Sequence, residues 1–295
     1  MRLVATFRVG QLICHALEGG LQRLDGGAMF GVVPKPLWSR RIEADDRNRV
    51  PIALRCLLVE HDDGLVLIDT GIGNKESAKT CEIYGIENKG TAGSTQLDDA
   101  LAEVGFSATD VRYVINTHLH FDHAGGNTMI PQGSSFTDGE AQVAFPNATY
   151  VVQRGELDFG GQVNERLSAS YFPKNFAPVA AADRWRLLDG DAEILPGIAA
   201  VLTPGHVPYH QSVKISDGGE TACFLGDVVP TTAHLRLPWI MGFDLEPLVT
   251  LESKRRLLTE AEAEGWILVF EHDPVWGLGR AIKDGKSFGF QALES

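Results

Sequence analysis

Residues 117–126 read THLHFDHAGG, and this stretch decides the fold. It directly follows a strand-like run. Its six-residue window holds four side chains of the kinds that bind metals, namely His118, His120, Asp122 and His123. The preceding run, Val111–Ile115, is apolar and rich in β-branched residues, which is typical of a buried strand. The chain has nine histidines in all, and three of them lie here. The stretch therefore predicts a metal site at the point where a strand ends and a loop begins.

Three later segments show the same arrangement of a strand followed by a potential ligand. ACFLGD ends at Asp227, WILVFEHD contains His272, and His206 lies in the turn LTPGH. Strands are rigid, and the loops at their ends converge at one edge of a sheet. We therefore expect these side chains to lie beside the four metal-binding side chains of the opening stretch. In the EHD triplet, Glu271 or Asp273 is an alternative ligand to His272.

Seven candidate ligands suit two metal ions better than one. His118 and His120 are two residues apart, so in an extended segment their side chains point the same way and can share an ion. Asp122 and His123 come after the turn and point elsewhere, which suits a second ion. Each ion needs three or four ligands, and two ions about 3.5–4 Å apart can hold a bridging hydroxide with a pKa of roughly 7. We expect two divalent ions. Zinc is the expected metal, and Mn, Fe or Co are alternatives.

Two neighbouring residues have alternative interpretations. Asp69 ends a strand-like run in the turn DTG, where it either orients a ligand histidine or only caps the turn. His210, four residues after His206, is more typical of a supporting or turn histidine than of a ligand.

The composition of the chain excludes several classes of partner. Hydrophobic residues make up 44% and charged residues 22% of the 295 residues, as in soluble globular proteins. The net charge of −13 disfavours binding to nucleic acid and to an anionic membrane. We find no membrane-spanning run and no signal peptide. The four cysteines are scattered, which indicates reduced thiols and a cytoplasmic location.

Hydrophobic patterning predicts mostly strands before and after a central irregular region. We expect strands over 2–9, 11–18, 53–60, 65–69, 111–115, 149–153, 185–188, 198–202, 211–215, 221–225 and 266–270, and helices over 94–105 and 247–265. No repeat or linker interrupts the pattern, so we expect a single domain over 1–295. It has a loop arm at about 26–41 and an insertion at about 127–180.

The arm is too apolar for a solvated loop, and it should cover either the mouth of a pocket or a second subunit, which makes a homodimer one interpretation. Ligand pockets are mostly apolar, and aromatic residues along the chain are candidates for lining one. The candidate pocket residues are Phe30, Trp38, Tyr171, Phe172, Phe176, His234 and Trp239. Packing in the core or in a dimer explains each of these side chains equally well.

The segments HLHFDHAGG, TPGH and LGD and the late His272, in this order, resemble the metallo-β-lactamase fold hydrolases. The resemblance extends from LIDTG at 67–71 to the last ligand. It implies an α+β fold, a four-layer αββα sandwich with the metals at one edge of its two sheets. It also implies that His118, His120 and His206 bind one ion, that Asp122, His123 and His272 bind the other, and that Asp227 bridges them.

Within this family, MFGVVPKPLW and HLHFDHAGGN look most like the branch of N-acyl-homoserine lactone lactonases and methyl-parathion-hydrolase-like enzymes. The implied activity is ring opening of a lactone, most of all an N-acyl-homoserine lactone (quorum quenching), by attack of the metal-bridging hydroxide. Asp227 and Asp122 are the catalytic candidates, and Asp122 delivers a proton to the leaving oxygen. Alternatives are a phosphotriesterase, arylesterase or other ester hydrolase of this fold, or, in another class, a metal-dependent binding or regulatory protein without turnover.

One position departs from the lactonase pattern. Some lactonases of the family carry a tyrosine three residues after the bridging aspartate, where it contacts the substrate carbonyl. The corresponding residue here is Pro230. Either the substrate differs, or another group takes this role, for which His234, Tyr209 and Tyr171 are candidates.

Overall fold

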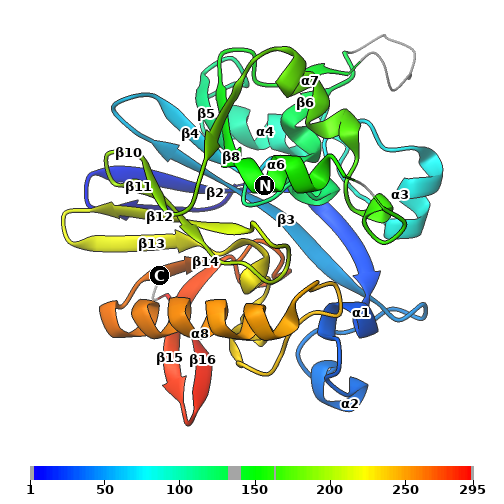
Figure 1. Cartoon of the computed structure of the whole chain (residues 1–295), viewed down its shortest axis with the longest axis vertical. Coiled ribbons are helices and arrows are strands. Elements are labelled where there is room, and N and C mark those ends of the chain that lie inside the picture. Colours follow the sequence, from blue (N-terminus) through cyan, green and yellow to red (C-terminus); the bar gives the residue numbers. More distant parts are fainter. Residues whose placement is uncertain (1–2, 132–140, 163, 294–295) are drawn as a thin grey trace.

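Two mixed β-sheets pack face to face between layers of helices in the computed structural model, which describes residues 3–131, 141–162 and 164–293 (Figure 1). Helix α4 covers the outer face of the first sheet, and α8 covers the outer face of the second. The four-layer αββα sandwich implied by the resemblance is therefore confirmed.

The first sheet is antiparallel in its first half and parallel in its second. Its strands, in spatial order, are β1 (Leu3–Val9), β2 (Leu12–Asp25), β3 (Arg49–Glu60), β4 (Leu65–Ile68), β5 (Val111–Ile115), β8 (Thr149–Gln153) and β9 (Trp185–Leu188). The pairs from β1 to β4 are antiparallel, whereas β4, β5, β8 and β9 pair in parallel. The stretch predicted as an insertion thus contributes an inner strand, β8, and its residues 132–140 and 163 lie outside the described part.

The second sheet follows the first along the chain. Its strands, in spatial order, are β10 (Ala192–Leu195), β11 (Ile198–Leu202), β12 (Gln211–Asp217), β13 (Glu220–Phe224), β14 (Ile267–Val269), β15 (Leu278–Asp284) and β16 (Ser287–Ala292). Only β13 and β14 pair in parallel among these described strands. The hairpin β15–β16 was not among the predicted strands. A separate two-stranded sheet joins β6 (Thr128–Met129) to β7 (Gln142–Val143).

Alternation along the strands explains why the sheets stack. In β3, Leu57 and Val59 face the other sheet, whereas Cys56 and Leu58 face α4. Both faces of the strand are buried, so its sequence reads as a continuous apolar run. The helices are α1 (Gly26–Phe30), α2 (Lys35–Trp38), α3 (Ala78–Tyr84), α4 (Gln96–Glu103), α5 (Phe121–Ala124), α6 (Arg154–Gly160), α7 (Ala177–Ala181) and α8 (Pro247–Glu264).

The arm at 26–41 is not a plain loop, because it contains α1 and α2. The Asp25 side chain accepts a hydrogen bond from the Ala28 N–H and so caps α1. The apolar residues of the arm pack against β3 and against the segment around Trp239 and Met241. No helix in the described residues is long and apolar enough to cross a membrane.

The loops after β4 and β5 pack backbone against backbone, which explains the two glycines of the opening stretch. The Thr70 N–H donates to the His123 carbonyl at 2.8 Å, and the Gly126 N–H donates to the Gly71 carbonyl at 2.9 Å. A Cβ atom on Gly126 would lie 2.1 Å from the Thr70 carbonyl oxygen, and one on Gly125 would lie 2.2 Å from the Ile72 carbonyl oxygen. Only glycine allows this approach.

Substituting Gly126→Ala should therefore lower the free energy of unfolding by about 1–3 kcal/mol, the usual cost of overpacking a tight site. Urea unfolding followed by circular dichroism measures the change. Gly161→Ala is the matched control, because its nearest contact would be 3.4 Å away and its backbone is ordinary for any residue. Equal stabilities of the two variants would contradict the close-packing explanation.

Candidate metal centre

The candidate ligands lie at one edge of the sandwich because their strands end there. β4 and β5 run parallel, as do β13 and β14. β11 has the direction of β13, since each pairs antiparallel with β12. The carboxyl ends of β5, β11, β13 and β14 precede the segments with the ligands, and ligand sites of open sheets lie at such ends. All seven sequence-predicted ligands are brought together at this edge.

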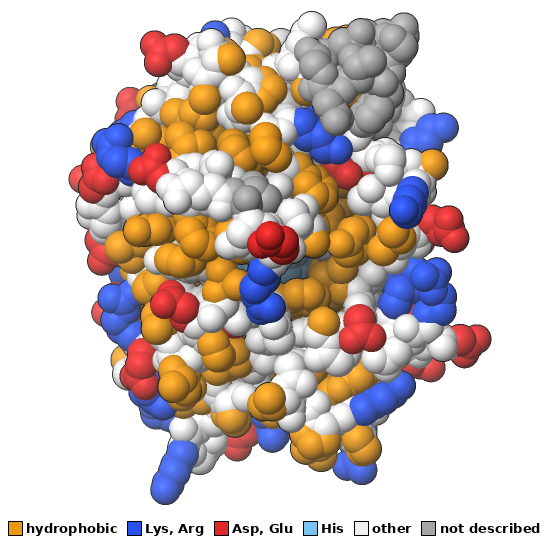
Figure 2. All heavy atoms as spheres, turned by 45° about the vertical axis from the view of Figure 1, so that its right-hand side comes forward, with side chains coloured by type: hydrophobic (Ala, Val, Ile, Leu, Met, Phe, Trp, Pro, Cys, Tyr) orange, Lys and Arg blue, Asp and Glu red, His pale blue; other side chains and the backbone are white. Residues whose placement is uncertain are grey.

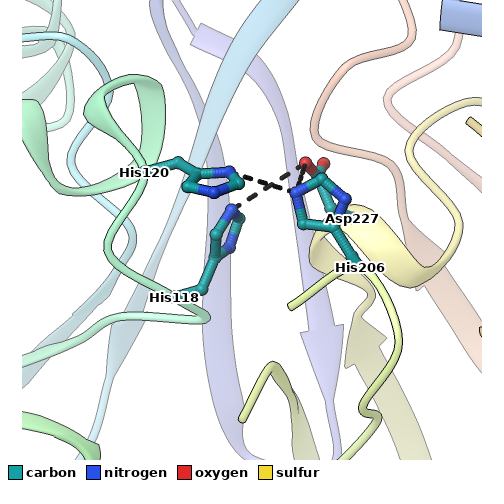
Figure 3. Close-up of side chains that lie close together, drawn as sticks. All are labelled: His118, His120, His206 and Asp227. Carbon is teal, nitrogen blue, oxygen red and sulfur yellow. Dashed lines mark hydrogen bonds and ion pairs between the residues drawn. The ribbon is translucent and has the colours of Figure 1, made fainter. Parts of the chain in front are cut away.

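One group of donor atoms comes from His118, His120, His206 and Asp227, and the four lie within 4.8 Å of one another. Figure 3 shows the two histidines that follow β5 facing His206 and Asp227 from the second sheet. The His206 Nε2 atom lies 3.0 Å from Asp227 Oδ2 and 3.1 Å from His120 Nδ1. The His118 Nε2 atom lies 3.9 Å from the same carboxylate oxygen.

A second group, formed by Asp122, His123 and His272, adjoins the first through Asp227. The His272 Nε2 atom lies 3.0 Å from Asp227 Oδ1, and the His123 Nε2 atom lies 3.5 Å from Asp227 Oδ2. The two imidazole Nε2 atoms are 3.1 Å apart. The Asp227 carboxylate thus stands between the two groups and faces both.

Hydrogen bonds on the outer ring nitrogens turn the inner nitrogens toward the centre. His206 Nδ1 pairs with Asp244 Oδ1 at 2.9 Å, and His272 Nδ1 with the Ala53 carbonyl oxygen at 2.8 Å. His123 Nδ1 is 3.1 Å from Asp69 Oδ2, so Asp69 contacts a candidate ligand histidine besides standing in its turn. Such outer partners fix the ring orientation of metal-binding histidines.

The chemistry of the donor set fits a divalent cation. Burial and the neighbouring histidines hold the pKa of His118 well below its ordinary value, so the ring is neutral, the form that binds metals. Burial alone would raise the pKa of Asp227, but His206, His272 and His123 outweigh it and hold that pKa well below the ordinary value. Among the described residues, His118 Nε2 is buried without a hydrogen-bond partner, and Asp227 Oδ1 is buried with only the His272 ring nitrogen beside it, at 3.0 Å. Buried lone pairs of this kind are suited to binding a cation.

Other described residues near the centre support it without being ligands of either group. The Gln22 amide donates to Asp122 Oδ2 at 2.5 Å, and the Asp227 N–H donates to His210 Nε2 at 3.0 Å. This hydrogen bond agrees with the interpretation of His210 as a supporting or turn histidine, which stays a prediction. Glu271 lies behind His123, with Oε2 3.0 Å from Nδ1, and forms a further potential ligand group with Asp69 and His123. The Asp273 carboxylate instead accepts from Thr232.

Sequence reasoning missed Asp244, Gln22 and this arrangement of Glu271. Asp244 lies in the irregular segment MGFDLEP, and Gln22 is an ordinary polar residue within a long strand. Neither segment carries a metal-binding motif, so no sequence signal marks them.

A cavity of about 340 Å³ opens beside the two groups, a size within the usual range of ligand pockets. Figure 2 shows hydrophobic side chains around a hollow with histidine at its floor. The described lining residues are Leu24, Ala28, Met29, Tyr84, His120, Phe121, Asp122, Arg166, Leu167, Ala169, Ser170, His206, Asp227, Met241, Gly242, Phe243, Leu245 and His272. The arm thus contributes to a pocket wall, as one of its two interpretations expected; the homodimer stays a prediction.

The seven residues predicted to line a substrate pocket lie outside this described lining. Phe30 stacks on Trp38 at 5.1 Å and on His234 at 4.9 Å, and Trp239 packs edge-on against it. Phe30, Trp38 and Trp239 belong to the core cluster that the arm forms with β3, and His234 contacts the Met29 carbonyl at its edge. Tyr171, Phe172 and Phe176 pack behind the wall formed by Phe121 and Leu167.

Comparisons with known proteins agree with this geometry. The family model of the metallo-beta-lactamase superfamily matches residues 53–272. An N-acyl homoserine lactonase from a Bacillus species is 32% identical over 228 residues, which cover 74% of this chain and 80% of that protein. The crystal structure of a probable metal-dependent hydrolase from Staphylococcus aureus superposes with a TM-score of 0.86 at 31% identity, covering 98% of this chain and 99% of the other. AidC, a dizinc quorum-quenching lactonase, shares the fold, with a TM-score of 0.80, 20% identity and coverage of 99% and 97%.

A two-sheet sandwich with histidine and aspartate groups at the shared strand edge defines a class of metal-dependent hydrolases. The chain belongs to the metallo-beta-lactamase superfamily. It is a metal-dependent hydrolase that acts on ester bonds.

Substituting Asp244→Ala should weaken metal binding about 10–100-fold, the usual effect of removing the outer partner of a metal-binding histidine. The reason is that His206 loses the carboxylate that fixes its ring, whereas every atom predicted to touch the metal remains. Competition with a chromophoric chelator measures the affinity. Asp63→Ala is the matched control, because that carboxylate also faces a histidine, His61, but on the exposed surface. Unchanged affinity in the Asp244 variant would remove this role.

Proposed function

We propose that this protein opens the ring of lactones, and of N-acyl homoserine lactones in particular, at a centre of two zinc or similar divalent ions. The observation that carries the proposal is the pair of ligand groups joined by Asp227 at the floor of an apolar cavity. The relationship to an N-acyl homoserine lactonase supports the choice of substrate. Such an activity would quench signalling by these lactones.

In this proposal, the six other ligand residues form two sets of three around Asp227. His118, His120 and His206 would hold one ion, Asp122, His123 and His272 the other, and the Asp227 carboxylate both. Two divalent ions held in this way supply positive charge that acidifies water and polarises an ester carbonyl. The donor set accepts zinc, and it also accepts manganese, iron or cobalt.

We assign to Asp122 the transfer of the proton that ring opening requires. Its carboxylate lines the cavity, and Gln22 fixes one of its oxygens, Oδ2. In the proposed reaction, water adds to the lactone carbonyl and Asp122 takes the proton that it releases. The bond between the acyl carbon and the ring oxygen then breaks, and Asp122 gives the proton to that oxygen. The product is an open-chain hydroxy acid, so atoms and charge balance.

The cavity wall suits an acyl chain. Leu24, Met29, Met241 and Phe243 present apolar side chains to the cavity, and water is displaced when an alkyl chain covers them. Each methylene buried in this way contributes about 0.8 kcal/mol. Affinity should therefore rise with acyl length until the cavity of about 340 Å³ is filled.

A substrate panel distinguishes the alternatives. We expect lactones with acyl chains of graded length to be opened, with the hydroxy acid detected by titration of released protons, and paraoxon-type triesters and aryl esters to react more slowly. Faster turnover of the triesters or aryl esters would favour the other ester-hydrolase function. A protein that binds two equivalents of metal but turns over neither class would favour a binding or regulatory role.

Variants of the ligands test the centre itself. His118→Ala and Asp227→Ala should each lose at least about a hundredfold in kcat, because loss of even an outer partner of a metal ligand costs 10–100-fold. Chelation should abolish activity, and added zinc should restore it in the parent protein alone. His15→Ala, which removes a strand histidine paired with Glu60 outside the centre, is the control and should keep its activity. Full turnover by metal-depleted His118→Ala would contradict the proposal.

A further inference from the structure

The substrate cavity holds few side-chain hydrogen-bond donors apart from the histidines of the centre. Within the described lining these are Tyr84, Arg166 and Ser170. Arg166 is exposed on the segment 164–170. A phenol is a stronger donor to a developing oxyanion than an aliphatic hydroxyl, because it is the more acidic group.

The residues considered earlier for this donor role are unsuitable. Pro230 has no donor. The hydroxyl of Tyr171 donates to Glu156 at 2.7 Å and is buried. His234 is occupied by Thr231 and by the Met29 carbonyl. The ring of Tyr209 lies 43% exposed against Gly155, outside the described lining of the cavity.

Tyr84 differs from all of these, because it is half-buried in the cavity and its hydroxyl makes no hydrogen bond to any residue in the described ranges. Its ring packs on Phe121, with centroids 5.2 Å apart, and Phe121 directly precedes Asp122. Burial, with the charge of Asp122 as the next cause, raises the pKa of the phenol, so the group keeps its proton.

The backbone around Tyr84 fixes this placement. The residue ends α3, and Gly85 follows in the left-handed region at φ 54°. Two hydrogen bonds of 3.0 and 2.8 Å then join Glu87 to Leu21 of β2, next to the Gln22 that holds Asp122. One strand therefore anchors both the phenol and the carboxylate.

We infer that Tyr84 is a catalytic hydrogen-bond donor to the carbonyl oxygen of the ester that is cleaved. The inference rests on the proposed hydrolysis. The carbonyl oxygen gains negative charge when water adds, and the leaving oxygen is bound to the same carbon. Adjacent groups can therefore serve both oxygens, with Asp122 giving its proton to the leaving oxygen and the phenol donating to the carbonyl oxygen. The substrate class that the proposal names for this donor is a neutral acyl ester or lactone, whose carbonyl oxygen accepts the hydrogen bond.

Tyr84→Phe tests the inference because it removes one oxygen and keeps the ring on Phe121. We expect kcat to fall about 100-fold, the usual effect of losing one oxyanion donor, with KM within about twofold of the parent. Metal content and the melting temperature should be unchanged. Tyr209→Phe, which removes a phenol oxygen from the exposed surface, is the matched control and should leave kcat as in the parent.

The outcomes separate this inference from the proposed function. If the parent opens lactones and Tyr84→Phe retains its kcat, the inference fails and the proposed function stands. A rise in KM with unchanged kcat, or loss of bound metal, also overturns it, since the residue would then bind substrate or support the centre. If the parent cleaves only aryl esters or triesters, the lactonase proposal fails, and the same variant measured on those substrates decides the role of Tyr84. If the parent cleaves none of them, both fail.

Discussion

The Asp227 carboxylate lies within 4 Å of the Nε2 atoms of four histidines, at distances of 3.0 Å from His206 and His272, 3.5 Å from His123 and 3.9 Å from His118. A carboxylate anion buried in this way is unfavourable unless a positive charge lies beside it. Without a cation, that charge has to come from protons: despite burial, nearby carboxylates hold the pKa of His123 well above its ordinary value and raise that of His272 to about 9. Cations bound between the same atoms can replace those protons. The rest of the structure must hold these groups together in either state.

Backbone carbonyls and buried cationic side chains provide much of that support. The Arg55 guanidinium donates to the carbonyls of Phe270, Glu271 and Asp273, and thereby fixes the segment that presents His272. Lys75 donates to the carbonyl of Gly125, near the end of the ligand stretch, and to that of Thr128, just beyond it. Burial disfavours the charged form of Lys75 and lowers its pKa to about 7. The surrounding carbonyls offset part of the cost of burying that charge. These buried side chains therefore hold the loops that carry the centre in place.

The two groups of candidate metal ligands could be predicted from the sequence because their residues form a recognisable local pattern. Histidine and aspartate at short spacing after an apolar run are rare except at metal sites, and the strand order then brings Asp227 and His272 to the same edge. The cavity wall could not be predicted in the same way. The aromatic residues Phe30 and Trp38 have the composition of a wall, yet they stack on each other in the core. Tyr84 and Asp244 acquire their roles only through tertiary contacts, which no local pattern encodes.

The different origins of centre and wall explain how the chain can depart from the lactonase pattern at Pro230 and still keep both candidate ligand groups. The Pro230 carbonyl accepts a hydrogen bond from the His272 N–H at 3.0 Å, so this position belongs to the frame of the centre. That contact uses only the carbonyl, which proline retains. The wall, in contrast, is built from α1, α3, the segment around Arg166 and the loop around Phe243, where change leaves the strand ends intact. A donor that position 230 lacks can therefore be supplied by α3, whose last residue, Tyr84, lines the same cavity as Asp122 from a different part of the chain.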